Sequence, residues 1–176
     1  MSTIKADNWT GVNGEPYNSI LQLVEGTNTT AFSITNPTGY YIETPLTVTL
    51  TTKRANSKFY VSCSNNFYTT SATVGWNIAI ARKIGSGSYA LGIGAGQAPT
   101  GADSAADSWM GFAHDSGLAA TSWNRTRTLL DSPDQPKGTS LTYTIFFSGW
   151  NRTGQGWLTY PGYNQTSRIH VMELAG

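Results

Sequence analysis

Strict alternation of apolar and polar residues constrains this chain more than any other feature. In LTYTIFF, at residues 141–147, one parity is entirely apolar, and in TPLTVTLT, at residues 44–51, leucine and valine alternate with threonine. A period of two places successive side chains on opposite faces of a β-strand. No stretch of useful length shows the 3.6-residue period of an amphipathic helix. The chain is therefore predicted to fold from strands alone.

Shorter segments of the same kind complete the predicted set of strands. Gly85-Ser86-Gly87 predicts a tight hairpin turn, because glycine accepts a positive φ at little cost. Many short strands separated by turn residues are typical of an all-β fold, an antiparallel β-sandwich of jelly-roll type. Besides the two stretches above, strands are predicted at residues 20–25, 57–64, 74–84, 89–94, 125–130, 156–160 and 167–174.

The domain organisation follows from where this pattern is absent. Residues 1–18 are polar and irregular, which predicts an arm or linker rather than part of the core. Residues 19–176 are predicted to form one sandwich domain. Within it, residues 96–124 show no periodicity and are rich in glycine, alanine, serine and aspartate. A loop of that length in a compact domain is uncommon and is often functional.

Composition excludes several classes of partner. Charged residues make up 12% of the chain and the net charge is +1, whereas a nucleic-acid-binding protein needs a concentrated basic face. No apolar run approaches the ~20 residues that cross a bilayer, so no membrane partner is expected. The N-terminus lacks the apolar core of a secretory signal. The 21 aromatic residues argue against disorder.

Residues with catalytic or metal-binding chemistry do not form a recognisable set. His114-Asp115-Ser116 holds the residue types of a hydrolase triad, but adjacent side chains rarely meet. The two histidines are too few for a zinc site, and Cys63 follows the buried parity of its strand. No cofactor, metal or catalytic residue is predicted. A glycosidase needs two carboxylates beside the scissile bond, and no pair is singled out among Glu25, Glu43, Asp131 and Glu173.

Aromatic residues are the better candidates for binding. Flat rings interleaved with amide, hydroxyl and guanidinium groups suit a sugar, and they equally suit a subunit interface. Packing at the edges of the sandwich is the third interpretation, and the sequence leaves all three open. The candidate ligand or interface contacts are Trp109, Trp123, Trp150, Arg152, Trp157, Tyr160 and Tyr163.

The second half of the chain resembles a known group of proteins. LLDSP, followed by TYTIFF, an aromatic hairpin and the terminal RIHVMELAG, is similar to small virion proteins and tail-fibre C-terminal modules of tailed bacteriophages, notably those of cyanobacteria. The opening STIKADNWTG and the stretch TPLTVTLTTKRANSKFYVSCS also resemble this group. The resemblance covers most of residues 40–95 and 125–176. It implies a β-sandwich, commonly trimeric, on a tail fibre, a spike tip or the capsid surface.

The resulting expectation is a non-enzymatic virion protein that is made in the cytoplasm of the host bacterium. It would be a homotrimeric module at a tail-fibre or spike tip that contacts a host-surface glycan, with residues 1–18 bound to other virion proteins. A capsid decoration protein is the alternative within the same class. A glycan-degrading depolymerase and a cellular lectin are the alternatives from other classes.

Overall fold

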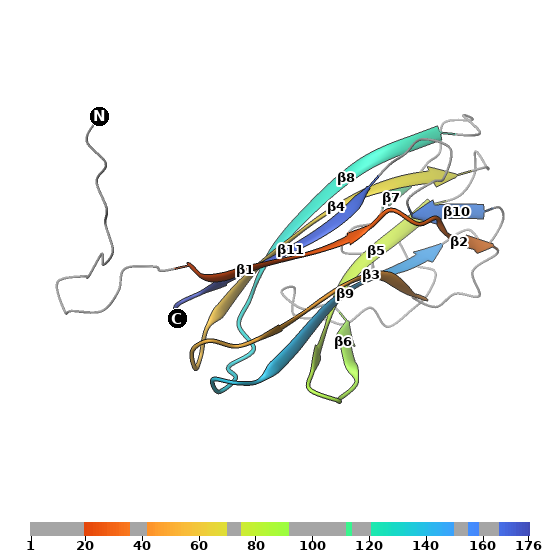
Figure 1. The fold of residues 1–176 in the computed structure, drawn as a ribbon. Coiled ribbons are helices and arrows are strands. Elements are labelled where there is room, and N and C mark those ends of the chain that lie inside the picture. The colour runs from red at the N-terminus through yellow and green to blue at the C-terminus, as the bar shows by residue number, and fades with distance from the viewer. Residues whose placement is uncertain are drawn as a thin grey trace, which may run out of the picture.

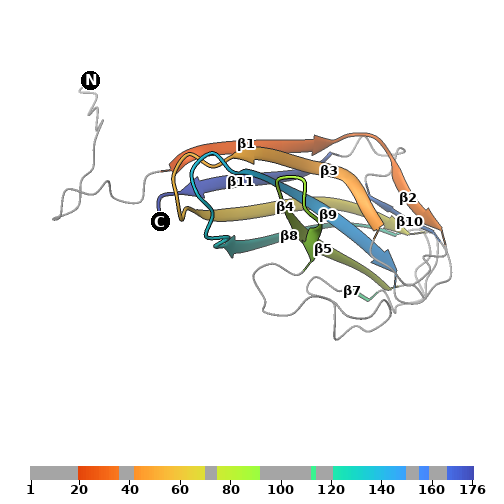
Figure 2. The ribbon, with the colours of Figure 1, turned by 90° about the horizontal axis from the view of Figure 1, so that it is seen from below.

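A computed structural model gives the fold of the chain. In it, the strands form two antiparallel sheets that lie face to face (Figures 1 and 2). Within the ranges described, no helix has the length and apolar character to cross a membrane. The structure describes residues 20–35, 42–69, 75–91, 112–113, 121–149, 155–158 and 166–176.

The first sheet has six strands and the second has five. The six-stranded sheet contains β1 (Ile20–Asn28), β2 (Phe32–Thr35), β4 (Lys58–Thr69), β8 (Thr121–Asp131), β10 (Gln155–Leu158) and β11 (Ser167–Leu174). The five-stranded sheet contains β3 (Ile42–Thr51), β5 (Gly75–Ile84), β6 (Tyr89–Leu91), β7 (Phe112–Ala113) and β9 (Ser140–Gly149).

The strand order is that of a jelly roll. The six-stranded sheet runs β1-β11-β4-β8; the short strand β10 also pairs with β4, at the end of β4 beyond β11, and β2 pairs with β10. The second sheet runs β3-β9-β5-β6, and β7 also pairs with β5. When the short β2, β7 and β10 are set aside and the other eight are counted along the chain, the orders are 1-8-3-6 and 2-7-4-5. Two interleaved Greek keys produce this arrangement. The fold prediction is therefore confirmed.

The alternating parity of the sequence builds the core. In β9, the residues Leu141, Tyr143, Ile145 and Phe147 are all fully buried. Neighbouring strands of the same sheet and the strands of the facing sheet supply the other apolar side chains between the sheets, which include Leu46, Val48, Phe59, Val61, Cys63, Ile78, Ile169 and Val171. Cys63 is buried, as its parity predicted.

Two turns pack against each other at one end of the sandwich. The turn after β3 and the turn after β8 exchange backbone hydrogen bonds, from Thr52 N–H to Thr139 C=O and from Gly138 N–H to Thr52 C=O, each at 2.9 Å. Gly138 has a φ of 88°, in the left-handed region that glycine adopts without strain. The C-terminus lies beside the start of β1 at this same end, where Ile20 is paired with Leu174 (Figure 1). We call this the clamped end.

Each predicted strand has a counterpart in the structure. β2 and β7 were not predicted, since four and two residues are too few to show a period. β7 and the start of β8 at Thr121 lie within residues 96–124, so the prediction of an unbroken loop is wrong for those residues. Small and polar residues in this range give no alternating pattern, so these strands were not evident from the sequence. They are held by backbone pairing with neighbouring strands. The remainder of that range and the predicted arm, residues 1–18, lie outside the described residues.

Candidate functional site

The aromatic and arginine candidates are not brought together as a described site. The backbone of Trp123 is paired with that of Phe67, and the backbone of Trp157 with those of Tyr68 and Ser33. The side chains of these two tryptophans lie outside the described part of the chain. The same holds for the whole of Trp109, Trp150, Arg152, Tyr160 and Tyr163.

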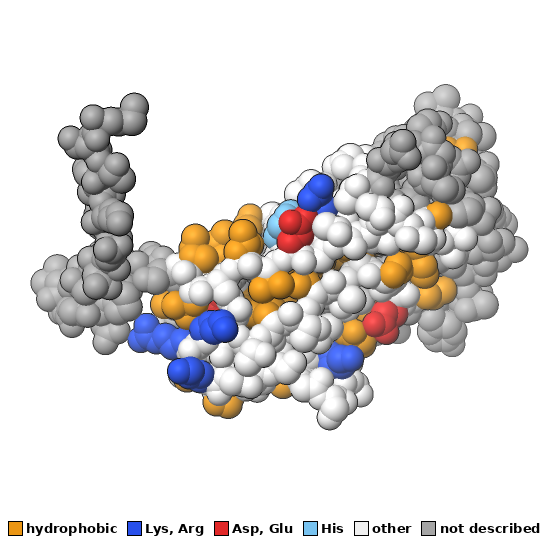
Figure 3. Space-filling model, viewed as in Figure 1, with side chains coloured by type: hydrophobic (Ala, Val, Ile, Leu, Met, Phe, Trp, Pro, Cys, Tyr) orange, Lys and Arg blue, Asp and Glu red, His pale blue; other side chains and the backbone are white. Residues whose placement is uncertain are grey.

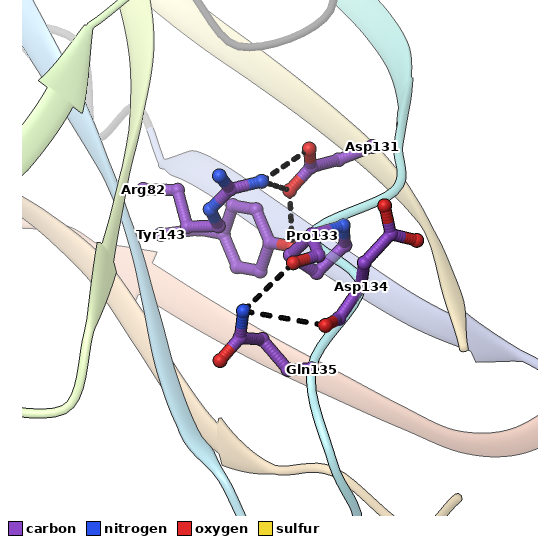
Figure 4. A network of polar contacts seen from close by, with 6 residues as sticks. All are labelled: Arg82, Asp131, Pro133, Asp134, Gln135 and Tyr143. Carbon is purple, nitrogen blue, oxygen red and sulfur yellow. Dashed lines mark hydrogen bonds and ion pairs between the residues drawn. The ribbon is translucent and has the colours of Figure 1, made fainter. Parts of the chain in front are cut away.

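Asp131, the aspartate of the LLDSP stretch, ends β8 and lies between the sheets. Its carboxylate accepts hydrogen bonds from Nη1 of Arg82, at 2.5 and 2.6 Å, and from the hydroxyl of Tyr143, at 2.8 Å (Figure 4). Arg82 comes from β5 and Tyr143 from β9, both in the five-stranded sheet. Asp131 comes from the six-stranded sheet, so the three residues join the two layers. We call them the clamp.

Glu173 makes a second connection between the sheets. Its side chain is fully buried on β11, and its carboxylate accepts hydrogen bonds from the backbone N–H groups of Lys53, at 2.8 Å, and Arg54, at 3.2 Å. The Nε2 of Gln22 donates to the same carboxylate at 2.5 Å and to the Thr51 carbonyl at 2.7 Å. A buried carboxylate requires such donors, because an unpaired buried charge is costly.

Asp131 of the clamp and Glu173 lie in the same row of the six-stranded sheet. The register places both Asp131 and Glu173 opposite Phe59, on either side of it. The ring of Tyr143 lies above Phe59, with 6.1 Å between ring centroids. Burial, and next the negative charge of Asp131, raise the pKa of the Tyr143 phenol well above its usual range. Two aromatic rings therefore fill the space between the two carboxylates, where a glycosidase would hold its substrate.

The other two carboxylates weighed from the sequence are exposed and lie on opposite sides of the molecule. Glu25 is on the six-stranded sheet, where Oε1 accepts a hydrogen bond from Nη1 of Arg168 at 2.5 Å and lies 3.6 Å from Nε2 of His170. Glu43 is on the five-stranded sheet and accepts a hydrogen bond from the Tyr89 hydroxyl at 2.8 Å. Within the described ranges, no three His, Cys, Asp or Glu residues gather as metal ligands do.

Cys63 has no reactive character. Burial raises the pKa of its thiol to about 11, although the positive charge of Arg127 acts in the opposite direction. A thiol is nucleophilic only as its thiolate, so Cys63 is inert in the folded chain.

The solvent-facing side of the six-stranded sheet carries the most distinctive surface. Leu23, Met172, Tyr60 and Leu130 are direct cross-strand neighbours on β1, β11, β4 and β8, so they form one apolar row across the sheet. Leu23 is 59% exposed, Leu130 53% and Tyr60 40%. Ile20, which is 58% exposed, and Leu174 extend the row toward the clamped end. We call this surface the outer face.

The next rows of the outer face are polar and differ from one side to the other. On β1 and β11 lie the charged and titratable residues Glu25, Arg168 and His170. On β4 and β8, the same rows hold Ser62 opposite Thr128 and Ser64 opposite Thr126. In Figure 3, acidic, basic and histidine side chains appear together beside a group of hydrophobic side chains. The outer face thus has an apolar row, a charged half, and a second half that carries hydroxyls and, toward the clamped end, Lys58.

The solvent-facing side of the five-stranded sheet is covered by its own side chains. Tyr89 packs edge-on against Phe146, with 5.1 Å between ring centroids, and its hydroxyl lies 3.0 Å from Oγ1 of Thr144. Threonine hydroxyls also pair across β3 and β9, with Thr47 2.8 Å from Thr144 and Thr49 2.9 Å from Thr142. Among the described side chains of this side, Phe146 is therefore covered and the threonine hydroxyls are paired.

Sequence reasoning selected other aromatic residues and missed the outer face. Leu130 follows Leu129, so one of two adjacent leucines had to point outward, and Tyr60 has the parity opposite to the buried Phe59 and Val61. Those signals were available. What the sequence did not supply is the register that aligns Leu23, Tyr60 and Leu130 in one row.

Comparison with known proteins assigns the chain to no family. No family model matches the chain, and no curated protein matches it. A solved chain described as "Structure of infectious bursal disease virus Gx strain" is similar to all of this chain, with 16% sequence identity and a TM-score of 0.36. The match spans 37% of that chain.

Proposed function

We propose that this protein is a non-enzymatic structural protein of a bacteriophage virion. The observation that carries the proposal is the use of the buried carboxylates: Asp131 and Glu173 are both saturated with donors that hold the two sheets together. A general acid or base needs a proton-exchanging group within reach of a substrate. These two groups are instead committed to keeping the sandwich closed.

The resemblance of the LLDSP stretch to phage virion modules supports the same conclusion. In this stretch, Leu129 packs against the core, and Asp131 is the carboxylate of the clamp. Ser132 and Pro133 begin the turn toward β9, and Nε2 of Gln135 donates a hydrogen bond to the Pro133 carbonyl at 2.8 Å. A particle protein must stay folded without chaperones, and a clamp at the crossing between sheets serves that need.

The finer placement on the particle is part of the proposal. We place the module at a tail-fibre or spike tip, with residues 1–18 docked on the particle and the opposite end presented to a host-surface glycan. The pairing of Ile20 with Leu174 supports this orientation, because it places the start of β1 at the clamped end. Capsid decoration would use the same orientation on a different part of the particle.

Immunogold electron microscopy of the phage particle that encodes this chain tests the placement. Label at the fibre or spike supports the first version, label over the head supports decoration, and the absence of the protein from purified particles contradicts the virion role. Incubation with host polysaccharide tests the class. Sustained release of reducing ends, lost in a variant of any one carboxylate, would show a depolymerase instead.

A further inference from the structure

We infer that the outer face of the six-stranded sheet is a two-fold contact between copies of this chain, in which β1 and β11 of each copy stack on β8 and β4 of the other. This inference does not depend on the virion role, because it concerns only how one copy recognises another. It rests on the pattern of side chains across the face, taken row by row.

The first argument is the exposed apolar row. Leu23, Tyr60 and Leu130 are each 40% exposed or more and lie in one line with Met172. Single exposed apolar residues are ordinary on protein surfaces, whereas a contiguous patch marks an interaction site. The comparable apolar group on the other sheet, Phe146 with Ala79 and Ala81, is covered by Tyr89. No side chain of the described residues covers the row in this way.

The second argument is that the face complements itself about one particular axis. A two-fold axis parallel to the strands keeps each row level and exchanges the two sides of the sheet. It places Leu23 against Leu130 of the second copy and Met172 against Tyr60 of the second copy. In the next row, Glu25 meets Thr128, and His170 meets Ser62. In these two rows, apolar groups contact apolar groups and charged groups contact hydroxyls that can hydrogen-bond to them. In the row toward the clamped end, the aliphatic stem of Lys58 meets Leu174 of the second copy.

An axis across the strands does not give this match. It places the apolar row of one copy on the apolar row of the other, but it brings the row on one side of it in the first copy against the row on the opposite side in the second copy. Ile20 would then cover Glu25 of the second copy, and Leu174 would cover His170, so that charged groups would be buried against apolar ones at a cost.

The size of the face agrees with a specific contact. Four strands at about 4.8 Å spacing and seven residues at about 3.3 Å each outline a flat area on the order of 500 Å². Side chains standing on that area expose more than its projection, which approaches the ~800 Å² per partner of a standard interface. Two sheets stacked in this way lie about 10 Å apart, with strand directions within about 30° of each other.

Sedimentation velocity of the full chain over a range of concentrations tests the contact. We expect a dimer whose dissociation constant rises at least about tenfold on Leu23→Thr or Leu130→Thr, because each substitution removes two symmetric contacts. Ile84→Thr is the matched control, since Ile84 is an exposed isoleucine of the other sheet. A chain that stays monomeric up to about 1 mM, or self-association that Leu23→Thr and Ile84→Thr change equally, overturns the inference.

Two charge variants at Thr128 test the axis in chains whose fold is undisturbed. Thr128 is exposed and should face Glu25 of the second copy. We therefore expect Thr128→Lys to tighten the dimer and Thr128→Glu to weaken it, with both effects reduced by salt. Equal effects of the two substitutions contradict the axis.

Cross-linking provides an independent reading of the same geometry. A short bismaleimide should join Leu23→Cys protein to Leu130→Cys protein in a mixture more readily than either to itself. The buried Cys63 thiol stays silent in this experiment. Preferential linkage of Leu23→Cys protein to itself would show the axis across the strands and would overturn the inference.

Discussion

The clamp and the outer face each contain an ion pair of the same length, and the two pairs have different roles. Arg82 and Asp131 are 2.5 Å apart between the sheets, with side chains 16% and 6% exposed. Arg168 and Glu25 are also 2.5 Å apart, but their side chains are 50% and 38% exposed. Exposed pairs contribute about 0–1 kcal/mol, whereas loss of one partner from a buried pair costs about 3–5 kcal/mol. Burial, not distance, separates a structural contact from an adaptable one.

This difference assigns separate tasks to the two regions. The clamp fixes the distance between the sheets, since one carboxylate holds residues from β5 and β9. The outer face leaves its charges close to water, where a partner can reach them. The substitutions below separate these tasks, from the largest expected effect to the smallest.

Asp131→Asn should have the largest effect on stability. It leaves the partly buried Arg82 guanidinium without its counter-charge, and we expect a loss of about 3 kcal/mol in the free energy of unfolding, measured by urea denaturation. The double variant Arg82→Met with Asp131→Leu should recover most of that loss, because no charge is left unpaired. An Asp131→Asn chain as stable as the parent would remove the distinction between the two ion pairs.

The labelling rate of Cys63 should report the same opening of the sandwich. At pH 8 the buried thiol, with its pKa raised to about 11, should react with a thiol reagent only when the sheets separate. Asp131→Asn should then speed labelling on the order of 100-fold, in proportion to the lost stability, while Glu25→Gln should leave the rate within about twofold. Rapid labelling of the parent chain would mean that the core is open.

Tyr143→Phe should have an intermediate effect that depends on pH. Removal of the hydroxyl leaves one acceptor position of Asp131 unfilled and should lower the free energy of unfolding by about 1–2 kcal/mol at pH 7. The pKa of the phenol is raised in the folded chain, so the unfolded chain releases this proton first. The associated stability is complete below about pH 10 and is lost as the pH rises further. Denaturation between pH 8 and 11 should show a shallower decline for Tyr143→Phe than for the parent.

Glu25→Gln should have the smallest effect on stability, within about 0.5 kcal/mol, because its pair with Arg168 is exposed. Its consequence should appear in association, since Glu25 lies on the proposed contact between copies. Urea denaturation and sedimentation velocity on the same samples separate the two quantities. A loss of stability as large as that of Asp131→Asn would show that the outer face also holds the sandwich together.

Period-two alternation was sufficient to predict the long strands, because each of them buries one face. The pattern at residues 141–147 specified both the strand and its buried parity, and Leu141, Tyr143, Ile145 and Phe147 are fully buried. It failed for β2 and β7, which carry too few residues to show a period and are held by backbone pairing with β10 and β5. A short strand is specified by its neighbours as much as by its own residues.

The candidate site was less predictable, since polar residues acquire their roles from distant partners. Asp131 and Glu173 were identified only as scattered carboxylates, and their partners lie 49 and 120 residues away in the chain. Tyr143 shares the parity of Leu141 and Ile145, but its bond to Asp131 depends on how β9 follows the turn. The choice of tryptophans as contacts stays a prediction.

By itself, the sequence determined that this chain is an all-β sandwich, because alternation and turn residues act locally and each long strand shows its own alternating pattern. Only the tertiary structure decided which carboxylates join the sheets and which exposed side chains align as one row. Those outcomes depend on register, and register is set by the whole sandwich closing around its core, where a shift of one residue would turn every side chain to the opposite face.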